Sequence, residues 1–126
     1  MNIIDGHTLV FFNYDGNGMY FSMCNIATTS EIGVLFMAFD RPARLRVRGR
    51  ATLSDDKAMV SRFPRAQFAV KVGITALIAN CPRYIPTMEL TSGSRYVPDA
   101  VTGAQHIPGW KRVDAIQAAL PARDQN

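Results

Sequence analysis

The sequence has few of the features that mark membrane, secreted or metal-binding proteins. No apolar run among its 126 residues approaches the roughly 20 residues that span a bilayer. The first residues contain neither the basic nor the apolar segment of a secretory signal. These absences lead us to expect a cytoplasmic protein without a membrane partner.

Cysteine and histidine are also scarce. Cys24 and Cys81 form no C-x-x-C motif, and free, packed thiols are expected for them in a cytosol. His7 and His106 are isolated, so no metal site is predicted. No serine or cysteine has a histidine partner nearby in the sequence, and we assign no catalytic residue.

Lysine is rare, so the positive charge rests on arginine. The formal net charge is +4, and lysine occurs only at positions 57, 71 and 111. Arginine favours anion contacts of fixed geometry. Nucleic-acid-binding proteins usually carry denser basic clusters, so nucleic acid is not the partner that we expect.

The hydrophobic pattern predicts four strands and three helices. Strands are expected at 8–13, 31–40, 44–53 and 67–79, and helices at 19–28, 57–60 and 110–120. Residues 31–40 are nearly all apolar, which predicts a central strand buried on both faces. A bend is expected at Gly73 in the last strand.

These elements favour a single mainly β domain over residues 1–126, with a barrel core at about 5–85 and a C-terminal extension at 86–126. Four strands are few for closing an antiparallel barrel, so an open edge would remain. A second subunit is the simplest cover for it. We therefore expect a homodimer.

Alternation places four arginines, 44, 46, 48 and 50, on one face of a strand, about 7 Å apart. Such a row is either a solvated face or a site for anions. A nucleic-acid platform would also need interleaved aromatic residues. Arg44 differs from the others because it stands at the strand start beside a turn, where ligand sites collect.

Two further segments carry polar groups at element ends. Pro82 ends the last strand and displays Arg83 beside Tyr84, a pair that suits a phosphate or a flat heteroaromatic ring. The turn at 14–18 opens a helix whose first N–H groups favour an anion, with Ser22 and Asn25 on the helix. The alternative explanations are a strand terminator with a snorkelling arginine and an ordinary turn.

The run from 5 to 53, with Tyr-Asp-Gly-Asn-Gly-Met at 14–19 and the arginine strand, resembles the pyridoxamine 5′-phosphate oxidase-like flavin-binding proteins. Asn-Cys-Pro-Arg-Tyr-Ile at 80–85, Ser-Arg-Tyr-Val-Pro at 94–98 and Pro-Gly-Trp-Lys-Arg at 108–112 are similar to one branch of that group. The resemblance covers nearly the whole chain, and the 80–85 segment is its most specific part.

The resemblance implies an antiparallel split β-barrel, a homodimer and FMN bound at the dimer interface. It places the FMN phosphate and ribityl chain near Asn17, Ser22 and Asn25, and the flavin near Arg44. Asn80 and Arg83 would close the site from the second subunit. The family's first helix and two strands have no counterpart here, so the expected barrel is N-terminally truncated.

Three functions follow as hypotheses. The first is an FMN-dependent oxidoreductase whose small-molecule substrate the sequence does not identify. The second is a non-catalytic dimeric barrel that has lost flavin. The third is a small module that binds anions or nucleic acid through the arginine strand.

Overall fold

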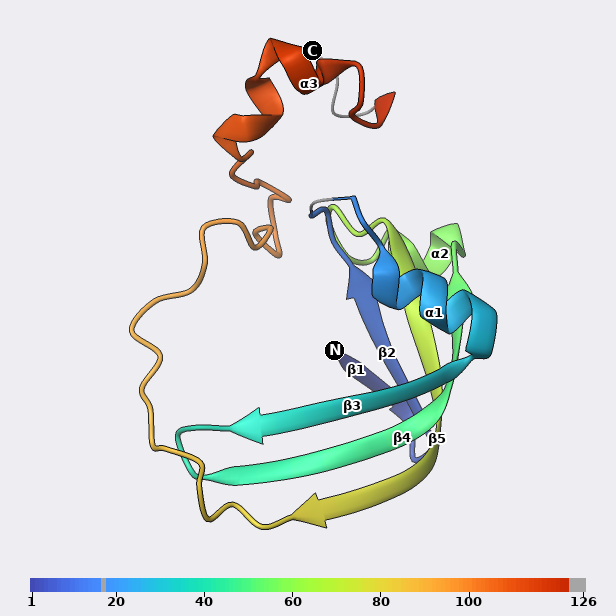
Figure 1. Cartoon of the computed structure of the whole chain (residues 1–126), viewed down its shortest axis with the longest axis vertical. Helices are drawn as coiled ribbons and strands as arrows, with labels where there is room; N and C mark the ends of the chain where they lie inside the picture. Colours follow the sequence, from blue (N-terminus) through green and yellow to red (C-terminus); the bar gives the residue numbers. More distant parts are fainter. Residues whose placement is uncertain (17, 123–126) are drawn as a thin grey trace. The chain divides into compact units, whose positions relative to one another are not determined.

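The computed structural model describes residues 1–16 and 18–122, which fall into two compact units divided between Thr91 and Ser92 (Figure 1). Every strand described belongs to the first unit. The second unit carries two short helices.

The first unit is built on one open antiparallel sheet with the strand order β1-β2-β5-β4-β3. The strands are β1 (Asn2–Asp5), β2 (Thr8–Asn13), β3 (Glu31–Ala38), β4 (Ala43–Ser54) and β5 (Phe68–Asn80). The expected mainly β, antiparallel class is confirmed, and β3 and β4 form a hairpin. The strand β1 was not expected; it pairs with β2.

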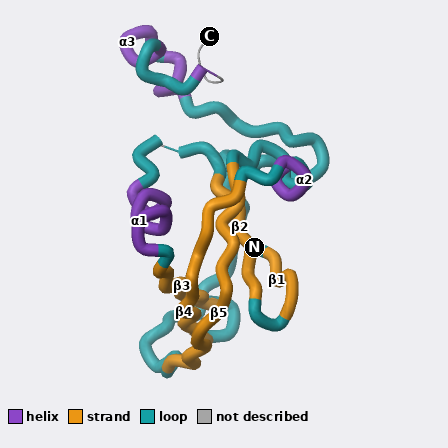
Figure 2. Tube along the Cα trace, turned by 90° about the vertical axis from the view of Figure 1, so that its right-hand side faces the viewer, coloured by secondary structure: helices purple, strands orange, loops and turns teal. Residues whose placement is uncertain are grey.

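Two helices flank the sheet on opposite sides (Figure 2). The helix α1 (Phe21–Thr29) begins two residues later than expected and ends at Ser30, whose N–H donates to the Ile26 carbonyl at 2.8 Å. The short helix α2 (Lys57–Val60) is capped by Asp56, whose carboxylate accepts from the Ala58 N–H at 2.9 Å. An aspartate at this position satisfies an N–H that the helix itself leaves unpaired.

The core lies between α1 and one face of the sheet. Alternation along β4 and β5 sends apolar side chains to this face, where their burial stabilises the fold by about 1.5–3 kcal/mol for each large residue. Its fully buried members are Leu9, Ile26, Val47, Ala51, Val70 and Val72. Leu45 and Leu53 alternate with the arginines of β4 as Val47 and Ala51 do, but both are more than one-third exposed.

The strand β3 is an edge strand, and the prediction that it is central and buried on both faces is wrong. Ile32, Val34 and Phe36 pack against the core, whereas Leu35 and Met37 on the other face are 49% and 41% exposed. An unbroken apolar run predicts two covered faces. In the sheet, β4 lies between β5 and β3, so β3 has a neighbouring strand on one side only.

The sheet is irregular where β4 crosses β5. Arg48 pairs with Ala76 and Gly49 with Ile74, so Thr75 is an extra residue on β5. The bend expected at Gly73 thus corresponds to a bulge two residues further on. A Cβ atom on Gly49 would lie 2.5 Å from the Gly73 carbonyl oxygen, so only glycine fits this crossing.

The second unit contains the 3-10 helix η1 (Gly109–Arg112) and the helix α3 (Asp114–Gln117). One continuous helix over 110–120 was expected, and that prediction is wrong. Val113 has an extended backbone, with ψ at 119°, and it separates the two turns. The periodic apolar residues of this segment therefore do not form one helical face.

Both cysteines are exposed, so the expectation that they are packed is wrong.

The helices of the described residues lack the length and apolar character needed to cross a membrane.

Candidate functional site

The end of the sheet where β4 begins and β5 finishes brings together two of the residues that the sequence singled out. Arg44 and Asn80 are direct partners across the antiparallel pair, and Met37 of β3 lies opposite Arg44 on its other side. Directly opposed residues in such a pair hold their side chains on one face, with Cβ atoms about 4.5–5.5 Å apart. The register therefore places a guanidinium beside a side-chain amide.

Both of these groups carry an unsatisfied polar atom. Arg44 Nε and Asn80 Oδ1 are shielded from solvent and have no hydrogen-bond partner among the described residues. One is a donor and the other an acceptor. Leaving such a group buried and unpaired costs about 1–3 kcal/mol, and a bound molecule with an acceptor beside a donor would relieve both costs.

The chain turns sharply directly after Asn80. The strand ends there as predicted, and the Ile85 N–H donates to the Pro82 carbonyl at 2.9 Å across the turn. Ile85 is buried and anchors the turn, while Arg83 and Tyr84 are exposed, the tyrosine to 89%. Arg83 is thus free to reach a ligand near the strand end or on a neighbouring molecule.

Ser22 and Asn25 are exposed on α1, at a different place on the sheet. Ser30, which follows α1, accepts a hydrogen bond from the Ala51 N–H at 2.7 Å, and this contact locates the helix end along β4. Seven residues of strand separate Ala51 from Arg44, about 23 Å at about 3.3 Å per residue. Asn17 lies outside the described residues.

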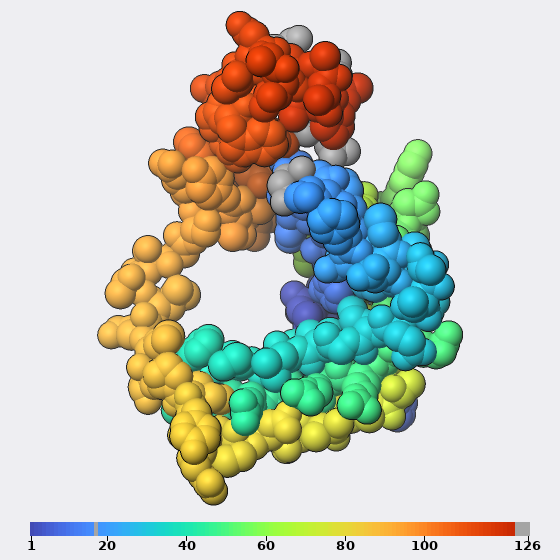
Figure 3. All heavy atoms as spheres, in the orientation of Figure 1, coloured from blue at the N-terminus to red at the C-terminus, as the bar shows by residue number. Residues whose placement is uncertain are grey.

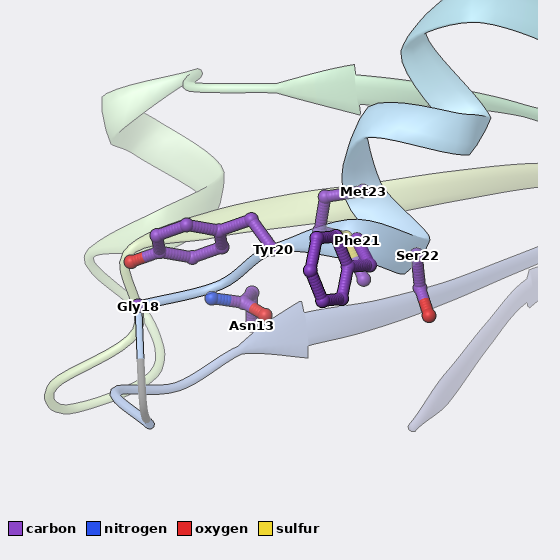
Figure 4. Close-up of a pocket in the computed structure, with 6 residues that line it drawn as sticks. All are labelled: Asn13, Gly18, Tyr20, Phe21, Ser22 and Met23. Atoms are coloured by element: carbon purple, nitrogen blue, oxygen red, sulfur yellow. The ribbon is translucent and has the colours of Figure 1, made fainter.

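A shallow pocket of about 310 Å³ opens at the start of α1 (Figure 4). It is lined by Asn13, Gly18, Tyr20, Phe21, Ser22 and Met23. The Ser22 side chain is directed away from the Tyr20 hydroxyl in this view. Tyr20 holds a left-handed backbone conformation, with φ at 48°, and no side chain caps the helix.

Gln67 organises this pocket, although nothing in the sequence pointed to it. Its Oε1 accepts from the Tyr20 hydroxyl at 2.7 Å and from Asn13 Nδ2 at 3.0 Å. Its own Nε2 is buried without a partner among the residues described. These contacts join segments more than forty residues apart, so only the folded chain reveals them.

The arginine face is confirmed as a row on one side of β4. Arg46, Arg48 and Arg50 are exposed, and Arg44 is partly buried. Arg50 Nη1 forms an ion pair with Glu31 Oε1 at 2.6 Å, with both side chains 65% exposed. Exposed pairs of this kind contribute little stability, so the face is open to an anionic partner.

No cluster of three or more histidine, cysteine or acidic side chains that could hold a metal ion occurs in the part of the chain that the structure describes. No protein-family model matches this sequence, and a search among curated proteins finds no match. The site must therefore be interpreted from its own chemistry.

Proposed function

We propose that this chain is an FMN-binding protein of the split-barrel type that acts as a homodimer, with flavin-dependent oxidoreduction as its activity. The observation that carries the proposal is the unsatisfied pair at the end of β4 and β5, Arg44 Nε and Asn80 Oδ1. The resemblance of the sequence to flavin-binding proteins supports the same ligand.

The chemistry of the two groups matches one edge of a flavin. The pyrimidine part of the flavin ring carries a carbonyl oxygen next to an N–H group. Arg44 Nε would donate to that oxygen, and Asn80 Oδ1 would accept from that N–H. When bound, the flavin would supply the redox chemistry, and the protein would bind and orient the ring.

The remaining groups would hold the charged end of the ligand. Arg83 is exposed on the neighbouring turn, and its planar guanidinium suits a phosphate. Ser22 and Asn25 lie on α1, whose end at Ser30 contacts Ala51, about 23 Å along β4 from Arg44. One chain therefore divides the proposed ligands between two places, which supports a site completed by a second copy.

A flavin-free dimer is the second candidate. The helix α1 carries no basic side chain (Phe-Ser-Met-Cys-Asn-Ile-Ala-Thr-Thr), so a phosphate beside it would lack a local countercharge. Under this alternative the fold and the dimer persist without a cofactor. Exposed, unpaired Cys24 and Cys81 fit a reducing compartment such as the cytoplasm for either candidate.

The test is a titration with FMN in which binding is monitored by the quenching of flavin fluorescence. We expect saturable binding that Arg44→Met and Arg83→Ala each weaken by about 10- to 150-fold, because a hydrogen bond to a charged group contributes about 1.5–3 kcal/mol. Arg48→Ala is the matched control, since Arg48 is exposed in the middle of the same strand, and it should change the affinity less than threefold.

The flavin-free protein gives a second readout. Because Arg44 Nε is buried without a partner, Arg44→Met should leave the free energy of unfolding unchanged or raise it by about 1 kcal/mol. A folded wild-type protein that shows no saturable FMN binding would refute the proposal and favour the flavin-free dimer. Equal losses of affinity in all three variants would place the site elsewhere.

A further inference from the structure

The two edges of the sheet differ in a way that indicates a partner for one of them. The strand β1 has four residues and a register shift between Ile3 and Asp5. The strand β3 has eight residues in continuous register with β4, and it contains no proline or lysine. Proteins disrupt free edges with short strands, bulges and charges. The strand β1 is short and bulged, whereas β3 is neither, and its one charged residue is Glu31 at its first position.

The backbone groups that β3 leaves open can be identified. The Ala51 N–H donates to the Ser30 carbonyl at 2.7 Å, so these residues form a hydrogen-bonded pair. Bonded and non-bonded pairs alternate along antiparallel strands. The N–H and C=O groups of Glu31, Gly33, Leu35 and Met37 therefore point away from β4, toward the free side of the sheet.

Nothing in the described part of the first unit occupies this side by backbone hydrogen bonds. The segment after β5 reaches it only at Phe39, one residue beyond the strand, where the Met88 N–H donates to the Phe39 carbonyl at 3.0 Å. In Figure 3 the atoms of β3 form a free margin of the sheet on the face in view.

We propose that β3 pairs antiparallel with β3 of a second copy, about a two-fold axis that passes beside Val34. In this register Glu31 faces Met37 of the partner, and Gly33 faces Leu35 of the partner. Each of the four residues with outward backbone groups then gains a bonded neighbour. A shift by two residues in either direction would leave one of the four unpaired.

The side chains are complementary in the same register. On the core face, Val34 meets Val34 of the partner, and Ile32 meets Phe36 of the partner, so the apolar layer continues across the axis. On the other face Leu35, 49% exposed, lies over Gly33 of the partner. A Cβ atom at Gly33 would have no neighbour within 4 Å, so there is room for a leucine side chain.

Charges also match. Met37 lies between Glu31 of the partner and its own neighbour Arg44, so the opposite charges stand two strands apart, about 9.5 Å. Glu31 Oε1 is paired with Arg50 Nη1 of its own chain at 2.6 Å, and an extended Arg44 side chain could span this separation to the same carboxylate. This inference rests on the dimer of the proposed function and names its interface.

The first test measures dimer dissociation by sedimentation, without flavin. Leu35→Lys places a charge on the interface strand and should raise the dimer dissociation constant at least 100-fold. Leu77→Lys is the matched control, because Leu77 is 60% exposed on β5, inside the sheet, and it should change that constant less than threefold. Circular dichroism confirms that both variants keep the fold.

The second test uses disulfide formation in a chain in which Cys24 and Cys81 are serine. Val34 lies in a non-bonded pair at the axis, where Cα atoms are about 4.5 Å apart, a separation that a disulfide can bridge. Val34→Cys should cross-link under mild oxidation at least tenfold faster than Thr52→Cys, an exposed position on β4.

A monomeric protein, a dimer that survives Leu35→Lys, or equal cross-linking rates would each overturn the interface. A failure of the flavin proposal alone would give a different experimental result. A dimer that loses stability through Leu35→Lys but does not bind FMN supports the interface and refutes the cofactor.

Discussion

At the scale of single residues, Gly49 is the tightest point of the sheet. A Cβ atom there would lie 2.5 Å from the Gly73 carbonyl oxygen and 2.6 Å from Val72 Cγ1. The first contact is with backbone, which cannot rotate away. The bulge on β5 lets two long strands cross closely, and the absence of a side chain at Gly49 makes that approach possible.

We predict that Gly49→Ala lowers the free energy of unfolding by about 1–3 kcal/mol, the usual effect of overpacking. Gly73→Ala is the control, since its added methyl group would meet the Arg50 carbonyl oxygen at an ordinary 3.8 Å. Urea denaturation of both variants measures the difference. Equal stabilities would show that the strands separate easily at this crossing.

The sequence identified Arg44, Asn80 and Arg83 individually, because each stands at the end of an expected strand or on a proline turn. It did not predict that Arg44 and Asn80 are direct neighbours, since register depends on the bulge at Thr75. Gln67 had no local signal at all. Its partners Asn13 and Tyr20 come from distant segments.

At the scale of elements, the alternating and β-branched segments were predicted well, and their positions in the sheet were not. The helix α1 and the strands β2, β4 and β5 lie where the pattern indicates. The uniformly apolar β3 carries no alternation to show which face is open. The four-residue β1 exists because of its pairing with β2, which composition does not reveal.

The turn at Asp99 in the second unit depends on ionisation. Its Oδ1 accepts from the Thr102 N–H at 2.7 Å, from the Thr102 hydroxyl at 2.8 Å and from the Val101 N–H at 3.0 Å. The backbone hydrogen bond from Thr102, followed by its hydroxyl, lowers the pKa of the Asp99 carboxyl below its ordinary value of 3.8.

A carboxyl with a lowered pKa stabilises the folded turn above its unfolded pKa of about 3.9. This contribution should disappear as the pH falls below about 4 and through the folded pKa. Carboxyl titration by NMR should find a pKa below 3.8 for Asp99, together with a matching shift of the Thr102 amide. Asp99→Asn should abolish that amide shift, and a carboxyl pKa at or above 3.9 would contradict the hydrogen bonding.

At the scale of the whole molecule, the first unit leaves much of its sheet incompletely covered. Leu35, Met37, Leu45 and Leu77 are all more than one-third exposed on β3, β4 and β5. Such surface on a small antiparallel sheet is consistent with association in solution. The proposed dimer would cover it in part along β3.

A dimer of this kind links stability to concentration. We predict that the melting temperature rises by about 3–6 °C for each tenfold increase in protein concentration. By mass action, each such increase adds about 1.4 kcal/mol to the free energy of unfolding of the dimer. Calorimetry across a hundredfold range measures the slope. A melting temperature independent of concentration, in a protein that sediments near 13.9 kDa, would refute the dimer.

The regular edge of β3 also has a consequence for a protomer that has lost its partner. An uncovered, apolar strand without proline or lysine accepts any extended chain, including segments of partly folded copies. Two-fold pairing uses up this edge in both copies and stops further addition. The same strand that would join two protomers would therefore begin fibrous aggregates whenever dilution or mutation separates them.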